Sequence, residues 1–268
     1  MQYDPIKRSL GNVFSQSVGM RKFLYHLLNL LLLRSWYIRK ELKKWARQKG
    51  DNLQALDAGS GFGQYTYFLQ SLNKNWKVIG VDVKTEQIAD CNSFFSKAGL
   101  KNVNFEYGDL TVFKSDKNFD LILCVDVMEH IEEDVTVFNN FGKIINKDGM
   151  LLISTPSDLG GSDVDHDHGA SFIDEHVRDG YNKEDIKQKL LNAGFSKVDV
   201  FYSYGKYGKA AWKMSMKFPI TVLNISKLFF IFLPFYYIIV FPLAYILNTI
   251  DLNADNKTGT GLIVKAIK

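Results

Sequence analysis

Three glycines at alternate positions follow the first buried strand that the sequence predicts. The stretch 56–64 reads LDAGSGFGQ, and a helix is predicted directly after it. Glycines at a strand-to-helix turn let the backbone approach a ligand closely, and the helix N-terminus offers free N–H donors. A dinucleotide-binding loop would read G-x-G-x-x-G/A. Here Gln64 holds the sixth position, and Asp57 precedes the first glycine by two residues, which favours a ligand with cationic groups over a pyrophosphate.

Strands and helices alternate after this loop. Strands are predicted near 53–58, 77–83, 103–109, 119–127, 149–155 and 196–203, and helices near 64–72, 85–98, 131–145 and 183–193. Gly99 and Gly194 are expected to end two helices as C-caps, and Asn182 to begin the last one. The alternation predicts an α/β fold with a parallel sheet covered on both faces. Ligands of such sheets bind outside the carboxyl ends of the strands.

The glycine stretch resembles motif I of the class I S-adenosylmethionine (SAM)-dependent methyltransferases. Four further segments resemble the later strands of that family in the same order, at 78–83, 105–110, 119–131 and 149–156. The resemblance covers roughly residues 50–204 and a last strand at 261–267. It implies the Rossmann-like sheet of that family, whose last strand is antiparallel and lies between the fifth and sixth strands.

The same resemblance implies SAM as the cofactor and assigns roles to its residues. The loop glycines would hold the methionine part, and Asp57 would meet its amine directly or through water. Asp82 would bind the ribose hydroxyls, and Asp109 with Leu110 the adenine. The residues expected to bind SAM are Asp57, Gly59, Gly61, Gly63, Asp82, Val83, Gly108, Asp109, Leu110 and Val125.

A polar stretch at 163–181 follows the fifth strand, at the ligand end of the predicted sheet. It holds three of the five histidines of the chain. An oxygen acceptor must lose its proton during methyl transfer, and imidazole titrates near neutrality, which suits a general base. His166, His168 and His176 are therefore the predicted bases. For each of them, a solvated or capping histidine is the alternative.

A metal site is disfavoured, although one element resembles a metal-binding one. Asp126, Glu129 and His130 are similar in spacing to an acid-x-x-Glu-His element of ubiquinone-pathway O-methyltransferases, which can hold a divalent cation. This chain has Asp126 where that family has Glu, and Glu-His is also frequent in methyltransferases without a metal. Helix capping and packing beside the cofactor are the favoured interpretation. The His-x-His pair within 163–168 has no second ligand cluster at a fixed spacing.

About 55 residues separate the sixth strand from the last, where a loop of a few residues is usual. Residues 228–250 carry no charge and are long enough to span a bilayer. Both flanking strands must join one sheet, so the segment must return, as a re-entrant hairpin or an in-plane helix pair. Pro234 and Pro242 are expected to break it. Five lysines between 206 and 227 suit an anionic cytoplasmic leaflet. Membrane contact is favoured over an apolar lid or a dimer interface.

Residues 20–48 predict one long helix or two short ones, with an apolar and a basic face. A helix that covers the core is favoured over one on a membrane surface. No cleavable signal is predicted, because the apolar run contains His26 and Asn29 and ends in Arg34. The predicted organisation is a helical segment at 1–49, a SAM-binding domain at 50–204 and 259–268, and an apolar insertion at 205–258.

Composition narrows the function further. The net charge of +4 is too small to argue for nucleic acid. Cys91 and Cys124 fall in a predicted helix and a predicted buried strand, which favours reduced thiols over a disulfide. The sequence predicts a SAM-dependent methyltransferase of a lipophilic, membrane-resident acceptor, acting at oxygen. The enzyme would be cytoplasmic and peripherally or monotopically bound to the membrane. The alternatives are a methyltransferase of a small soluble metabolite and a non-enzymatic SAM-binding module that recruits a partner to the membrane.

Overall fold

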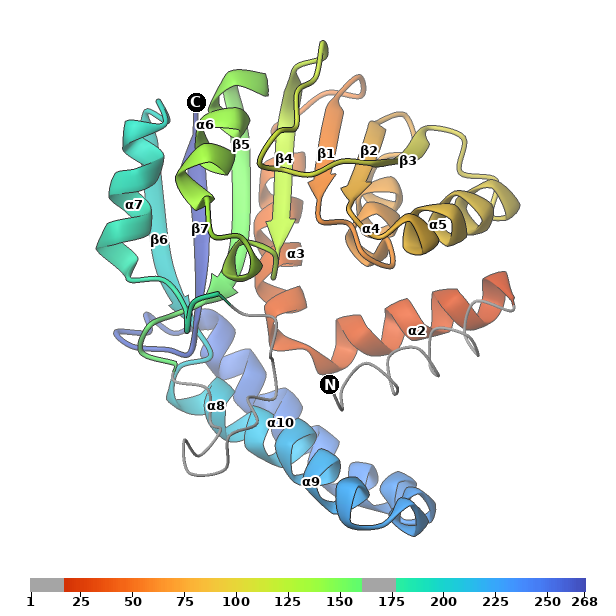
Figure 1. Ribbon diagram of the computed structural model, residues 1–268. Coiled ribbons are helices and arrows are strands. Elements are labelled where there is room, and N and C mark those ends of the chain that lie inside the picture. Colours follow the sequence, from red (N-terminus) through yellow and green to blue (C-terminus); the bar gives the residue numbers. More distant parts are fainter. Residues whose placement is uncertain (1–16, 161–176) are drawn as a thin grey trace.

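A computed structural model describes residues 17–160 and 177–268, which fold around one seven-stranded sheet (Figure 1). The strands are β1 (Gln54–Ala58), β2 (Lys77–Asp82), β3 (Val103–Tyr107), β4 (Phe119–Val125), β5 (Ile145–Pro156), β6 (Lys197–Ser203) and β7 (Gly261–Ile267). The α-helices are α2 (Val18–Leu31), α3 (Leu33–Ala46), α4 (Gln64–Leu72), α5 (Thr85–Lys97), α6 (Asp134–Ile144), α7 (Lys183–Asn192), α8 (Lys206–Trp212), α9 (Phe218–Ile225) and α10 (Leu233–Asn253). Shorter helical segments are η1 (Met128–His130), η3 (Lys213–Lys217, a π-helix) and η4 (Lys227–Ile231).

The strand order is β3-β2-β1-β4-β5-β7-β6. β1 to β5 pair in parallel, whereas β7 is antiparallel to both of its neighbours. The predicted position of the last strand between the fifth and the sixth is therefore confirmed. Since β6 and β5 are each antiparallel to β7, they run in the same direction. The carboxyl ends of β1 to β6 consequently share one edge of the sheet.

Side chains that alternate along the strands divide the core into two layers. Leu123 of β4 packs in the layer that contains Leu42 of α3, and the next residue, Cys124, packs with Phe138 of α6. Helices therefore cover both faces, as the alternation of elements predicted. Cys91 and Cys124 are both buried free thiols.

The predicted helix ends are confirmed at three positions. Gly99 and Gly194 have left-handed backbones, with φ of +72° and +88°. The side chain of Asn182 accepts hydrogen bonds from the backbone N–H groups of Glu184 and Asp185, at 3.0 and 3.3 Å. Gly and Asn at these places relieve the unpaired backbone groups that every helix end leaves.

Some predicted boundaries were wrong around β4 and β5. β4 ends at Val125 rather than at 127, because Asp126 adopts a left-handed φ of +53°. The predicted helix 131–145 is replaced by η1 and by α6, which begins at Asp134. β5 begins at Ile145, which pairs with Phe119 across an irregularity in the ladder. The strand predicted at 149–155 therefore begins four residues earlier than expected.

Residues 18–46 form two helices rather than one. Leu32 has an extended backbone that separates α2 from α3. α3 buries one face, including Leu33, Ile38 and Leu42, so the predicted core-covering role is confirmed for this helix. α2 instead runs beneath the strand ends of β1 and β2 (Figure 1).

The insertion between β6 and β7 folds as a helical hairpin that projects from the sheet edge (Figure 1). α8, η3 and α9 form the outgoing arm, and α10 returns along it. The hydroxyl groups of Tyr236 and Tyr237 donate to the backbone carbonyls of Met214 and Ser215, each at 2.7 Å. The prediction that the apolar segment returns is therefore confirmed.

Pro234 lies beside the expected break in the apolar segment, where η4 ends and α10 begins, but Pro242 does not break the segment. Pro234 lies in the first turn of α10, where its missing N–H has no helical partner in any case, and α10 continues through Pro242. A proline inside a helix removes one hydrogen bond. Ala244, two residues after Pro242, is buried. The chain reverses at Ser226, whose extended backbone and hydroxyl begin η4.

A buried carboxylate fixes the hairpin to the domain. Asp251 of α10 accepts hydrogen bonds from the hydroxyl of Tyr37, at 2.8 Å, and from the backbone N–H of Gly208, at 2.8 Å. A Cβ at position 208 would lie 2.6 Å from Cδ2 of Leu33 and 2.8 Å from Cγ of Asp251. The hairpin root thus packs closely on α3, and the hairpin has a fixed orientation relative to the sheet.

Candidate functional site

The glycine loop, residues 59–63, turns sharply between β1 and α4. Its three glycines have φ of +77° at Gly59, +50° at Gly61 and +75° at Gly63, a region that L-residues rarely adopt. A Cβ at Gly59 would also lie 2.2 Å from Cγ2 of Val127. The loop backbone can pass here only because residue 59 has no side chain.

The loop is tied to the end of β2. The backbone N–H groups of Gly59 and Ser60 both donate to the carbonyl of Val81, at 2.8 and 3.0 Å. The N–H of Gly61 donates to a carboxylate oxygen of Asp82, at 2.9 Å, and the N–H of Lys84 donates to the other oxygen at 2.9 Å. These bonds hold the Asp82 carboxylate beside the loop, at the carboxyl edge of the sheet.

The next strand adds a second acid at the same edge. Tyr107 pairs with Asp82, and the N–H of Gly108 donates to the Asp82 carbonyl at 3.1 Å. The Asp109 carboxylate accepts from the N–H and hydroxyl of Thr111, at 2.9 and 2.7 Å. Val83 is 55% exposed and Leu110 is buried. Val125 ends β4, the strand that pairs with β1. The structure therefore gathers the ten residues predicted to bind SAM at one edge.

Asp57 is the most deeply buried acid of this group. Its side chain is almost inaccessible, and Oδ2 accepts a hydrogen bond from the hydroxyl of Thr66 at 2.6 Å. Burial raises the pKa of Asp57 to about 6, against the opposing effect of Thr66. A buried anion is costly unless it is paired. The protein thus holds one poorly compensated carboxylate directly behind the glycine loop.

Asp57→Asn is expected to stabilise the ligand-free protein at neutral pH. Because the folded-state pKa lies above the ordinary value of 3.8, the folded state binds the proton more tightly, and stability falls as pH rises from about 4 to about 6. Asparagine removes this loss and can still accept from Thr66, which predicts a gain of up to about 3 kcal/mol at pH 7. Urea unfolding at pH 4 and pH 7 measures it. The exposed Asp116→Asn variant is the control, and an equal gain at both pH values would contradict the explanation.

Ser60 contributes an unused polar group to the loop. Its hydroxyl oxygen is buried and has no hydrogen-bond partner among residues 17–160 and 177–268. Buried polar atoms in folded proteins nearly always have partners, so such an atom requires an explanation. A polar ligand seated on the loop would provide the missing hydrogen bond. The tight glycine backbone, the two edge acids and this hydroxyl together fit a ligand with amine, carboxylate and ribose groups.

A second polar group lies at the ends of β4 and β5. Asp126 forms an ion pair with Arg34, with 2.5 Å between Nη1 and Oδ2, which links the start of α3 to the sheet edge. Glu129 is buried and accepts from the hydroxyl of Thr155 at 3.2 Å. Burial and the nearby Asp126 carboxylate raise the pKa of Glu129, so its neutral form is favoured. This cluster gives the edge beside the glycine loop a polar wall.

The remaining predicted site residues are the candidate metal ligands and the three candidate bases. Within the part of the chain that the structure describes, no group of three or more His, Cys, Asp or Glu side chains is placed to hold a metal ion. Asp126 and Glu129 have the partners given above, and His130 ends η1. His166, His168 and His176 lie outside the described residues.

Sequence reasoning missed a contact between α2 and the glycine loop. Arg21 is 2% exposed, and its Nη2 donates to the backbone carbonyl of Phe62 at 2.8 Å. Tyr25, one helical turn later, is also buried and donates to the same carbonyl. A signal was present, because Arg21 and Tyr25 are four residues apart and so share one face of the helix. A charged residue on an otherwise apolar helix face indicates a specific polar partner in the structure.

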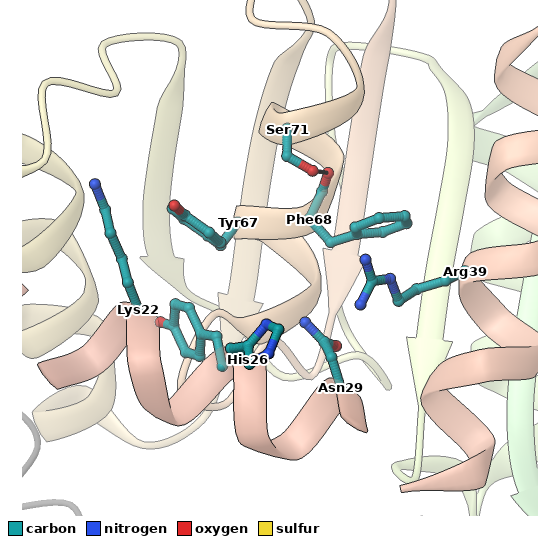
Figure 2. A pocket seen from close by; sticks show the side chains of 8 residues that line it. Lys22, His26, Asn29, Arg39, Tyr67, Phe68 and Ser71 are labelled. Atoms are coloured by element: carbon teal, nitrogen blue, oxygen red, sulfur yellow. Dashed lines mark hydrogen bonds between the residues drawn. The ribbon is translucent and has the colours of Figure 1, made fainter. Parts of the chain in front are cut away.

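A cavity of about 250 Å³ lies between α2, α3 and α4, beside this contact (Figure 2). Its lining residues are Lys22, Tyr25, His26, Asn29, Arg39, Tyr67, Phe68 and Ser71. The Arg39 guanidinium lies over the Phe68 ring, 4.5 Å from its centre. None of the residues predicted to bind SAM lines the cavity, so it is separate from the site at the sheet edge.

The strand order, the glycine loop and the edge acids define a class I SAM-dependent methyltransferase. A family model described as a methyltransferase domain matches residues 49–201, which is more than half of the chain. The chain belongs to this methyltransferase-domain family, and SAM is the cofactor of the family. The predicted class, fold and cofactor are therefore confirmed.

Curated relatives and solved structures agree with this class. The chain is 26% identical over 132 residues to a ubiquinone biosynthesis O-methyltransferase of Rickettsia akari, covering 49% of this chain and 51% of that protein. It is 29% identical over 149 residues to a phosphoethanolamine N-methyltransferase of Triticum aestivum, covering 54% and 28%. Phosphoethanolamine N-methyltransferase 2 of Haemonchus contortus, solved with SAM, shares the fold with a TM-score of 0.61 at 18% identity, covering 87% of this chain and 52% of that one.

These matches are partial. The chain aligns with only 28% to 51% of the length of the curated relatives. The names of the relatives given above differ in whether the acceptor atom is oxygen or nitrogen.

Proposed function

We propose that the protein transfers the methyl group of SAM to an oxygen of a lipophilic acceptor that resides in a membrane, working from its cytoplasmic face. One observation carries the proposal: the apolar hairpin leaves the sheet at the same edge as the glycine loop. β6 ends at Ser203 and β7 begins at Gly261, and these residues pair with each other. Gly261 also pairs with Pro156 at the carboxyl end of β5.

The SAM-binding residues are proposed from the geometry of the edge. SAM, when bound, supplies an electrophilic methyl group on a sulfonium. The loop glycines hold its methionine part and Asp57 balances the amine. Asp82 binds the ribose, and Asp109 with Leu110 bounds the adenine. The fixed Asp82 carboxylate, the buried Asp57 charge and the unpaired Ser60 hydroxyl support this assignment.

The surface of the hairpin supports membrane contact. Its exposed large apolar side chains are Phe218, Ile225, Leu228, Phe229, Phe230, Ile231, Phe232, Phe235, Ile238, Ile239, Leu243, Ile246 and Ile250. The chain contains no Asp or Glu from Lys206 to Ile250, whereas lysines recur along the outgoing arm. A patch of this size is unusual on a protein surface that faces only water. A cationic apolar hairpin suits an anionic leaflet.

The depth of insertion is limited by the sheet. In the described ranges, α10 is one helix with the length and composition to cross a membrane, with a mean hydropathy of 1.6 and only 11% of its apolar window buried. Both ends of the hairpin join neighbouring strands, so the hairpin must enter and leave on the same side. We therefore assign it as a monotopic anchor. The proposed organisation is an N-terminal helical segment, a SAM-binding domain and this membrane insertion.

The acceptor site is proposed between α2 and the hairpin root. Leu24, Leu27, Leu28 and Leu31 of α2 remain partly accessible. Trp36 of α3 contacts Tyr245 of α10 at 4.9 Å between ring centres, which joins the two apolar elements. An acceptor that enters along these surfaces from the bilayer reaches the edge where the glycine loop lies. Holding donor and acceptor aligned supplies much of the rate in such a displacement.

An oxygen acceptor also needs a base, and His166, His168 and His176 remain the predicted candidates. Two other functions stay possible: methylation of a soluble metabolite with the hairpin as a tether, and SAM binding without turnover. Removing the hairpin would leave the first intact, and substituting the histidines would leave the second unchanged. A comparison of cell extracts separates the three functions, because a lipid pair, an aqueous pair or no pair differing by one methylene unit corresponds to each in turn.

Cells that lack this gene should be complemented with the wild-type gene or with the Asp82→Ala variant, and their lipid and aqueous extracts compared by mass spectrometry. We expect a lipid species to disappear without the gene and a species lighter by one methylene unit to accumulate. Asp82→Ala should behave like the empty control. A pair found only in the aqueous extract would contradict the lipophilic acceptor. Full complementation by Asp82→Ala would contradict methyl transfer.

A further inference from the structure

We infer that Arg21 and Tyr25 of α2 are positioning residues for the methyl donor, because they hold the glycine loop in the shape that receives its methionine part. The inference rests on the proposed assignment of that loop to the methionine part and is independent of the acceptor. It makes α2 a component of the SAM site, although α2 contributes none of the acids at the sheet edge.

The first contact is at Phe62, in the middle of the loop. Its carbonyl accepts from Nη2 of Arg21 at 2.8 Å and from the hydroxyl of Tyr25. Nε of Arg21 donates to the same hydroxyl at 2.8 Å. Two donors from one helix face therefore converge on a single loop carbonyl, with their own geometry fixed by a third hydrogen bond.

The second contact is at the preceding residue. The Cys91 thiol donates to the Gly61 carbonyl at 3.3 Å, and Nη2 of Arg21 lies 3.2 Å from the same sulfur. Nη1 of Arg21 forms an ion pair with Asp90. One guanidinium thus reaches two consecutive loop carbonyls, one directly and one through Cys91. Lysine has no planar fork of donors and cannot make this set of contacts.

Fixing a carbonyl also fixes the N–H group on the other side of the same peptide. The peptide between Gly61 and Phe62 is planar and trans, so its N–H points away from its carbonyl. Cys91 of α5, itself contacted by Arg21, holds the Gly61 carbonyl, and this directs the N–H of Phe62 to the opposite side of the loop. Glycines adopt many backbone conformations when unrestrained. The contacts from Arg21, Tyr25 and Cys91 remove this freedom before the ligand binds, which lowers the entropic cost of binding.

A third contact holds the residue that begins α4. Nε2 of Gln64 donates to Oδ1 of Asn29 at 2.9 Å and lies 3.1 Å from the Ser35 hydroxyl oxygen. Figure 2 shows Asn29 on α2, with its side chain directed toward α4. α2 therefore contacts the loop at Phe62 and the first residue of α4 at Gln64. Gln64 replaces the small residue of a dinucleotide loop, and this contact gives it a role.

The charge of Arg21 persists in this buried place. Burial alone would lower the pKa of Arg21, but Tyr25, Cys91 and Asp90 outweigh it, and the pKa lies above its ordinary value. The guanidinium also lies over the Phe94 ring, 4.8 Å from its centre. A buried cation retained with this many partners has a specific structural task. Its polar partners are Tyr25 of the same helix, the loop, and Asp90 and Cys91 in the middle of α5.

The test compares two ligands by calorimetry on the full chain: S-adenosylhomocysteine, which has the methionine part, and adenosine, which lacks it. Arg21→Met should weaken S-adenosylhomocysteine binding about tenfold, the effect of losing buried hydrogen bonds at the loop. Adenosine affinity should stay within about twofold of the wild-type value, since Asp82 and Asp109 are untouched. Lys22→Met, an exposed cation on the same helix, should change neither affinity.

Two further variants keep the test decisive if Arg21→Met does not fold. Tyr25→Phe retains the ring that packs edge-on against Phe94 and removes only the hydroxyl; a selective loss for S-adenosylhomocysteine is again expected. Arg21→Lys should fall between the wild type and Arg21→Met. Equal losses for both ligands would mean general loosening and would overturn the inference, as would no loss at all. Wild-type protein that binds adenosine but not S-adenosylhomocysteine would instead contradict the proposed function.

Discussion

Replacing Gly59 by alanine is expected to abolish S-adenosylhomocysteine binding and to lower the free energy of unfolding by roughly 3 kcal/mol or more. The added Cβ would meet Cγ2 of Val127 at 2.2 Å and Cγ1 at 3.0 Å. Val127 follows β4 and cannot withdraw without disturbing η1. The left-handed φ of +77° adds its own cost for an L-residue. Relief of the clash must move the loop, and with it the Asp82 contact.

Gly99→Ala is the matched control for this prediction. Its φ of +72° is nearly the same, but nothing lies within 4 Å of the added Cβ. We expect a loss of about 1 kcal/mol and no change in ligand affinity. Urea unfolding and calorimetry measure both variants. Equal effects of the two substitutions would show that backbone strain alone acts at Gly59, and would remove the argument for a steric requirement in the loop.

Placing two aspartates on the hairpin is expected to lower the affinity for anionic vesicles at least about 100-fold, because each charge at membrane depth costs up to about 3 kcal/mol. Phe235 and Ile239 are suitable sites, with 67% and 77% exposure and one helical turn between them. Neither side chain supports the packed core. Folding and S-adenosylhomocysteine affinity should therefore be unchanged. Vesicle sedimentation at constant lipid concentration provides the measurement.

The control variant adds the same two negative charges outside the hairpin. Val112 and Val135 are exposed apolar residues outside the hairpin, at 71% and 47%, and their replacement by aspartate should weaken vesicle binding little. If Phe235→Asp with Ile239→Asp leaves vesicle binding intact but converts a dimer into a monomer, the hairpin is a subunit interface. That outcome would contradict the membrane anchor while leaving the SAM site unaffected.

Local sequence was sufficient for the sheet and for most helices. The apolar run of β4, glycine at positions 99 and 194, and Asn182 at a helix start are short-range signals, and each is consistent with its predicted element. The return of the hairpin followed from topology rather than from local pattern. The position of the turn did not, because Pro234 and Pro242 are compatible with a helix here, whereas Ser226 gave no strong signal by itself.

The candidate site was predictable only where a motif spans neighbouring residues. The loop glycines, Asp82 and Asp109 lie at strand ends, so their convergence followed from the parallel order. Arg34 and Arg21 were not recognised, since their partners Asp126 and Phe62 are far away in the chain. Long-range pairs of this kind depend on how α2 and α3 pack against the sheet. Basic residues in an amphipathic helix normally indicate a solvated face, and Arg21 is an exception.

The pairing of β6 with β7 has a consequence for the order of folding. These strands are neighbours in the sheet, yet residues 204–260 separate them. Closing a loop of about 57 residues costs about 2–3 kcal/mol more chain entropy than closing a tight turn. Packing of α8 on α10 shortens the effective loop, so chains whose hairpin forms first complete the sheet fastest. Lipid or detergent that stabilises the hairpin should therefore accelerate refolding of the whole domain.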